Sequence, residues 1–174
     1  MSALNRTPQN TNYLQPTKFI LTFDKIPDTQ YFCKTINIPG LTLGTAEMNT
    51  PFRRIPLAGS SIDYNPLNIT FNINGDLGAW FDLHEWMRSI GSPVGFDDRR
   101  SVVDGVGRSA PMMAYAEATL TIMNNLNNPI GRIQYYNVYP TSLSDVDFDT
   151  TQSADEIMVA SASFSFEYYD YIRI

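Results

Sequence analysis

The feature that most constrains the fold is a strict alternation of polar and apolar side chains in residues 68–74, which read Asn-Ile-Thr-Phe-Asn-Ile-Asn. In an extended chain Ile69, Phe71 and Ile73 lie on one face, and the asparagine and threonine side chains lie on the other. A helix would distribute the same apolar side chains around its circumference. The pattern therefore predicts a β-strand with one buried face, within an extended stretch over residues 61–74.

A second alternating segment, residues 156–171, is the longest in the chain. Its apolar face carries Met158, Ala160, Ala162, Phe164, Phe166 and Tyr168. The opposite face, which is rich in hydroxyl groups, carries Ile157, Val159, Ser161, Ser163, Ser165 and Glu167. We expect one long strand with an apolar side and a polar side.

Two pairs of shorter alternating segments predict hairpins: residues 17–24 with 30–37 around Pro27-Asp28, and residues 113–123 with 132–139 around an asparagine-rich turn. Residues 47–58 are also extended in character, but Pro51 and Pro56 restrict them to an edge strand or to partial pairing.

The spacing of the apolar side chains changes once along the sequence. From Ala79 to Ile90 apolar side chains recur every three or four residues, and Gly91-Ser92-Pro93 follows as a stop, which predicts one amphipathic helix. Residues 94–111 have no lasting period and exceed the usual loop length, which predicts a functional role for them. The fold class is therefore mainly β, an antiparallel sandwich or barrel with one flanking α-helix.

The chain length sets the domain organisation. Its 174 residues suffice for one ordinary domain, which we assign to residues 17–174. Residues 1–16 are rich in Asn, Thr, Gln and Pro and predict a flexible N-terminal arm.

The net charge of −6 argues against a protein that reads DNA or RNA through a basic face. Nine arginines accompany only three lysines, a bias that either marks surface covered by other subunits or reflects genome composition. The single cysteine, Cys33, gives no disulfide, and no apolar run is long enough for a signal or a membrane span. We expect assembly in the cytoplasm and no membrane partner.

One motif is consistent with metal binding. From Asp145 to Glu156, oxygen-bearing side chains occupy the ligand positions of a calcium-binding loop, with Asp145, Asp147, Asp149 and Glu156 as the acidic ligands. The sharp-turn position holds Thr150 instead of glycine, and no helix is predicted before the loop. An exposed strand face explains the same alternation, so calcium remains an alternative only.

No catalytic constellation is complete. His84 is the only histidine and falls beside the apolar stripe of the predicted helix, and Gly59-Ser60-Ser61 does not form a nucleophile elbow. The sequence contains no phosphate-binding loop and no dinucleotide fingerprint. We expect no enzymatic activity and no cofactor.

The order of several segments resembles the tail tube protein of contractile-tailed bacteriophages of the T-even type, over about residues 17–172. The segments that carry the resemblance are Phe32–Thr35 with Ile38-Pro39-Gly40, Pro51–Gly59, Trp86–Gly91, Tyr139–Ser144 with its acidic continuation, and Phe164–Tyr169.

This resemblance implies a structural virion protein whose hexameric rings stack into a hollow tube, with a β-barrel wall shared between subunits. The implied partners are further copies of the chain, the tail sheath protein, the baseplate tube initiator and the tail terminator. DNA would pass through the tube without specific binding, since six copies at −6 each carry −36. The virion tail is the implied location, after assembly in the host cytoplasm.

The tube hypothesis assigns residues to surfaces. Residues 61–74 and 156–171 are candidates for the barrel wall, and Ser161, Ser163, Ser165 and Glu167 are candidates for its inner lining. Candidates for contacts between subunits or rings are Phe52, Arg53, Arg54, Asp97, Asp98, Arg99 and Arg100.

Two alternatives stay open. A baseplate initiator or a tail terminator would use the same fold in a single ring. A monomeric calcium- or carbohydrate-binding β-sandwich would use the loop from Asp145 to Glu156.

Overall fold

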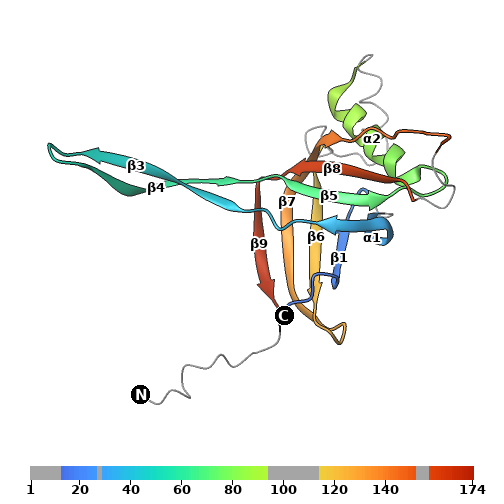
Figure 1. The fold of residues 1–174 in the computed structure, drawn as a ribbon, viewed down its shortest axis with the longest axis horizontal. Helices are drawn as coiled ribbons and strands as arrows, with labels where there is room; N and C mark the ends of the chain where they lie inside the picture. Colours follow the sequence, from blue (N-terminus) through green and yellow to red (C-terminus); the bar gives the residue numbers. More distant parts are fainter. Residues whose placement is uncertain (1–12, 27–28, 94–113, 152–156) are drawn as a thin grey trace, which may run out of the picture.

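The computed structural model describes residues 13–26, 29–93, 114–151 and 157–174 (Figure 1). The strands are β1 (Phe19–Phe23), β2 (Cys33–Ile36), β3 (Leu41–Asn49), β4 (Arg54–Tyr64), β5 (Leu67–Asn72), β6 (Ala116–Met123), β7 (Pro129–Leu143), β8 (Val159–Ser165) and β9 (Tyr168–Arg173). The helices are α1 (Thr29–Phe32) and α2 (Gly78–Gly91).

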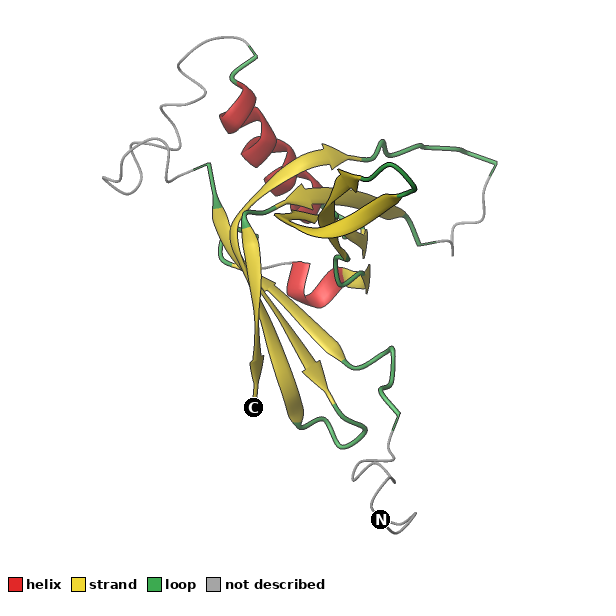
Figure 2. Ribbon diagram, turned by 90° about the vertical axis from the view of Figure 1, so that its left-hand side faces the viewer, coloured by secondary structure: helices red, strands yellow, loops and turns green. Residues whose placement is uncertain are grey.

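Strand β7 connects two antiparallel sheets, which we call sheet A and sheet B. Sheet A has the order β1-β6-β7-β9 and uses the first part of β7. Sheet B has the order β7-β8-β5-β2 and uses the last part of β7. Figures 1 and 2 show the strands of the two sheets crossing at a steep angle, with α2 beside the C-terminal part of β7. The predicted fold class, mainly antiparallel β with one flanking helix, is confirmed.

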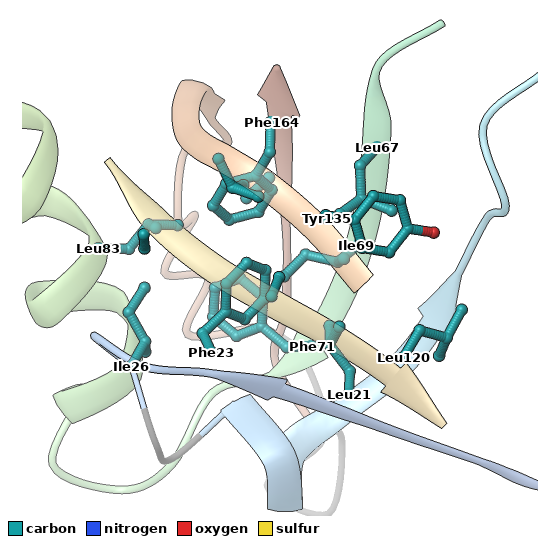
Figure 3. Packing of buried hydrophobic residues seen from close by; sticks show 14 of the residues in the cluster. Leu21, Phe23, Ile26, Leu67, Ile69, Phe71, Leu83, Leu120, Tyr135 and Phe164 are labelled. Carbon is teal, nitrogen blue, oxygen red and sulfur yellow. The ribbon is translucent and has the colours of Figure 1, made fainter. Parts of the chain in front are cut away.

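The buried core lies between the sheets and under α2, and Figure 3 shows its packing. Phe164 is fully buried, with its ring centroid 5.0 Å from that of Phe23 and 6.1 Å from that of Trp86. Ile69 and Phe71 on β5 are buried as the alternation predicts, and Ile73 packs against them.

Helix α2 matches its prediction closely. Ala79, Leu83 and Trp86 form its buried face. The indole N–H of Trp86 donates a hydrogen bond of 3.0 Å to the carbonyl of Ala114, and that of Trp80 donates one of 3.2 Å to the carbonyl of Ser144. Because both indoles have acceptors, they hold the helix against the residues that precede β6 and follow β7 without an unpaired donor.

The first predicted hairpin is wrong. Residues 17–24 and 30–37 contain strands, but β1 pairs with β6 and β2 pairs with β5. The short helix α1 stands between them, so the chain leaves sheet A and enters sheet B. The second hairpin is confirmed, since β6 pairs with β7, although β7 extends beyond the predicted end to Leu143.

The predicted single strand over residues 156–171 is broken into β8 and β9 between Ser165 and Tyr168. The break coincides with a bend in β7, where Asn137 has a left-handed backbone with φ of 52°. The amide of Glu167 donates to the carbonyl of Tyr136 at 3.0 Å, and the Asn137 side-chain amide donates to the Glu167 carboxylate. Strands commonly pass between packed sheets at such bends.

The break also shifts the alternation by one residue. Ala160, Ala162 and Phe164 are buried as predicted. After the bend, however, Tyr169 faces the core against Tyr135, with ring centroids 5.6 Å apart, and Tyr168 is 40% exposed. The predicted apolar face therefore ends before Tyr168.

Residues 41–64 contain a separate two-stranded sheet in which β3 pairs only with β4. Figure 1 shows this hairpin, which we call the arm, projecting away from sheets A and B. The predicted edge strand over residues 47–58 is therefore two strands and a tip, with Pro51 in the tip and Pro56 paired with Glu47. The predicted stretch 61–74 divides at Asn65-Pro66 into the end of β4 and the whole of β5.

We expect Phe164→Ala to lower the free energy of unfolding by about 3–5 kcal/mol, because the substitution leaves a cavity at the centre of the core. Phe148→Ala is the matched control, since Phe148 is 76% exposed and should tolerate the same truncation within about 0.5 kcal/mol. Urea unfolding followed by circular dichroism measures both variants. Equal losses would contradict the placement of Phe164.

Candidate functional site: the hydroxyl face and the arm tip

The outer face of sheet B is covered by neutral polar side chains. Strand β8 pairs with β5 so that Ser163 lies opposite Asn68 and Ser161 lies opposite Thr70. The same face continues with Ser142 on β7 and Thr35 on β2. We call these six residues the hydroxyl face: Thr35, Asn68, Thr70, Ser142, Ser161 and Ser163.

Hydrogen bonds hold the hydroxyl face together. The Ser163 hydroxyl donates to the Asn68 side-chain oxygen at 2.6 Å, and the Ser144 hydroxyl accepts from the Ser161 amide at 3.0 Å. Beside it, the Thr141 hydroxyl donates to the carbonyl of Ser163 at 3.0 Å. All six side chains of the hydroxyl face are uncharged, and the bond between Ser163 and Asn68 links its strands β8 and β5.

The structure separates the four residues predicted to line a tube. Ser161 and Ser163 lie together on the hydroxyl face. Ser165 is half-buried at the end of β8, opposite Tyr139. Glu167 lies at the bend between β8 and β9, where it accepts from Asn137. The carboxylate thus belongs to the corner between the sheets and not to the hydroxyl face.

The arm tip exposes three of the predicted contact residues. Phe52 is 98% exposed, and Arg53 and Arg54 lie beside it. The Thr50 hydroxyl closes the tip by donating to the carbonyl of Arg53 at 2.6 Å. Arg54 forms an exposed ion pair of 3.4 Å with Glu47 across the strands. The other predicted contact residues, Asp97, Asp98, Arg99 and Arg100, lie outside the described residues.

The acidic segment after β7 is exposed. Asp149 accepts hydrogen bonds from the amide and hydroxyl of Thr151 at 2.8 and 2.7 Å, and these bonds lower the pKa of its carboxyl group. Within the described ranges, no three His, Cys, Asp or Glu side chains gather into a metal-binding group. Glu156, the last residue of the calcium alternative with Asp145 and Asp147, lies outside those ranges.

A groove of about 660 Å³ between α2 and the end of β7 was missed by sequence reasoning. His84 stacks on Trp80 along this groove, with centroids 5.3 Å apart, and Asp145 lines its other side. The only sequence signal was the position of His84 beside the apolar stripe, which did not predict that the strand end would meet it.

Comparison with known proteins resolves the family. The sequence profile described as "Phage tail tube protein" matches residues 8–172. The chain belongs to this phage tail tube family. Among curated relatives of this tail tube family member is the "Tail tube terminator protein" of Enterobacteria phage T4, which is 24% identical over 165 residues. The alignment covers 91% of this chain and 88% of the T4 protein.

Solved structures share the fold of this tail tube family member. A chain in the structure of the anti-feeding prophage tube-terminating cap matches with a TM-score of 0.64 and 15% identity, covering 100% of both chains. A chain in a sheath/tube terminator structure of an extracellular contractile injection system matches with a TM-score of 0.59 and 17% identity, covering 94% of this chain and 99% of that one. A chain in the anti-feeding prophage baseplate structure matches with a TM-score of 0.65 and 11% identity, covering 95% and 98%. In the part of the chain that the structure describes, no helix has the length and apolar character needed to cross a membrane.

The reactivity of Cys33, the first residue of β2, tests how this edge of sheet B is buried. Burial raises the pKa of its thiol from 9.0 to about 11, which lowers the thiolate fraction at pH 8 about a hundredfold. We expect native Cys33 to react with a thiol reagent about a hundred times more slowly than the same thiol in the unfolded chain. The rate should rise with pH until about pH 11. Stopped-flow labelling in native buffer and in urea measures it, and equal rates would contradict the burial of Cys33.

Proposed function

We propose that this protein terminates the tail tube of a contractile tail. In this role a ring of copies binds the last ring of tube protein and stops further addition. The observation that carries the proposal is the similarity over nearly the full length of both chains to the T4 tail tube terminator. A stacking tube subunit was the leading expectation from the sequence, and the terminator role, then an alternative, now has the better support.

Incomplete sheet edges support assembly into a ring. Among the described residues, β1 pairs only with β6, and β9 pairs only with β7, so each end of sheet A has one unpaired side. Strand β2 likewise ends sheet B. Unpaired N–H and C=O groups on edge strands favour pairing with another chain. Copies arranged around an axis would satisfy them, and the family resemblance favours six.

We assign the hydroxyl face to the inner wall of this ring. Ser161 and Ser163 provide an uncharged lining. This lining offers no cationic side chain to the phosphates of DNA. The net charge of −6 per copy adds a repulsive field around the passage. Transit of DNA without retention follows from both properties.

We further propose the partners of the protein and its location in the virion tail. The protein acts by assembly and not by catalysis, in keeping with its family. Its partners are further copies of itself, the last ring of tube protein and the sheath with its own terminating proteins. It assembles in the host cytoplasm and stays in the virion tail.

Tube polymerisation tests the terminator role. We expect the isolated protein to form rings but no tubes at any concentration, because a terminator offers only one competent ring face. Added to polymerising tube protein at about one ring per hundred rings, it should shorten the tubes, and gold labelling should mark a single end. Long tubes of this protein alone, or label along the whole tube, would restore the tube-subunit role.

Labelling with maleimides of two sizes tests whether the hydroxyl face lines the passage. We expect Ser161→Cys and Ser163→Cys in assembled rings to react with a small maleimide but not with a maleimide on a polymer wider than the bore. Asp147→Cys, on the exposed acidic segment, is the control and should react with both. Native Cys33 contributes little background because its pKa is raised to about 11. If the polymer reaches Ser161→Cys as readily as Asp147→Cys, the hydroxyl face does not line the passage.

A further inference from the structure

The arm exposes a series of large apolar side chains. Its strands pair only with each other. The exposed fractions of its larger apolar side chains are 57% for Leu41, 52% for Leu43, 54% for Ile62, 46% for Met48 and 47% for Leu57. A lone two-stranded hairpin is marginally stable in water, and exposed apolar patches mark interaction sites. The arm is therefore built for a partner.

The apolar side chains change ribbon face halfway along the arm. Near the body, the apolar positions are the pairs Leu41 with Tyr64 and Leu43 with Ile62, which share one face. Toward the tip, the apolar positions are the pairs Ala46 with Leu57 and Met48 with Ile55, which share the other face. The positions between these on each half are mostly polar.

A bulge stands where the face changes. The pair Leu43 with Ile62 is followed by Thr45 with Ala58, so β3 advances two residues (45 − 43) while β4 advances four (62 − 58). Gly44 and Gly59 approach closely here, since a Cβ on Gly59 would lie 2.4 Å from the carbonyl oxygen of Gly44. Bulges bend a strand and increase its twist.

The paired strands of the arm twist around each other, and bulges add to such a twist. Figure 1 shows the two strands crossing at mid-arm: β3 lies below β4 near the body and above β4 toward the tip. Because the paired strands exchange places at this crossing, the ribbon presents opposite faces on the two sides of it, and the change of apolar face compensates for this reversal. Both apolar sets therefore lie on the same side of the arm, in one stripe from Leu41 and Leu43 to Met48 and Leu57.

We propose that this apolar stripe lies on a second copy of this chain, the lateral neighbour in the ring. The proposal rests on the terminator role, because a protein present as one ring meets its own kind only sideways. Residues 45–58 contain Glu47, Arg53 and Arg54 and carry +1, so the rest of a chain of −6 carries −7. The outer arm is thus complementary in charge to the body of another copy.

The reach of the arm fits the same partner. The nine residues of β3 span about 30 Å at roughly 3.3 Å per residue, which is close to the width of a small domain. Near the body the stripe continues into Tyr64, whose ring centroid lies 5.5 Å from that of Phe166 and 5.5 Å from that of Tyr169. The stripe can therefore cross a whole neighbour while it remains continuous with its own core.

Four matched single substitutions test the proposal. Leu43→Lys and Leu57→Lys place a charge on the stripe, in the inner and outer halves of the arm. Thr42→Lys and Thr45→Lys place the same charge on the opposite side, again one in each half. We expect the two stripe variants to raise the concentration for half-assembly of the ring at least tenfold, and the two controls to change it less than twofold. Sedimentation velocity over a concentration series measures this, and hydrogen exchange in the monomer verifies that the arm stays paired.

Three other results for these variants would overturn the proposal. Loss of assembly in all four variants would mean that the arm is enclosed on both sides. Similar behaviour of Leu43→Lys and Thr45→Lys, which share a ribbon face, would mean that the crossing of the strands does not align the two apolar sets on one side. If no variant weakens the ring but the stripe variants fail to shorten tubes, the stripe binds tube protein and not a second copy. Failure of the unsubstituted protein to shorten tubes would instead count against the terminator role alone.

Discussion

The structure depends on one strand that serves two sheets. One edge of β7 pairs with β6, and the other edge pairs first with β9 and then with β8. At the bend between these two partners, Asn137 donates a hydrogen bond to Glu167. Because backbone groups buried without partners are costly, β7 can change sheets only where other donors and acceptors replace the interrupted ladder. The bend directs the apolar faces of both sheets toward Phe164 and Tyr135, so one core serves the whole body.

Sequence alone predicted which side chains are buried better than which strands pair. The alternation at Ile69 and Phe71 and the helical spacing of Leu83 and Trp86 are local properties, and both were confirmed. The pairing of β1 with β6 depends on a distant strand, and nothing in residues 17–37 encodes it. The shift from Tyr168 to Tyr169 follows from a bend in β7, a different part of the chain.

The candidate site was predictable to a similar degree. The serines of β8 form a polar face because the alternation demands it, but the neutral character of that face depends on neighbours from β2, β5 and β7. Glu167 continues the same alternation in the sequence, but it does not lie on the hydroxyl face because the strand bends before it. The family came from collinear segments, whereas the preference for a terminator over a tube subunit needed a comparison with a relative.

The arm and the sheet edges together would favour the proposed assembly of this chain into a ring. As a monomer it carries −6, which opposes association in the absence of specific contacts. Covering the apolar stripe would stabilise the arm. This gain has to exceed the conformational entropy that a marginal hairpin loses when it is ordered against a neighbour. In an open row of copies one arm stays uncovered at one end, one arm-binding surface stays empty at the other, and each end keeps an unpaired sheet edge, whereas a closed ring satisfies all of them. Closed rings would therefore be favoured over partial assemblies, which is what the proposed terminator role requires.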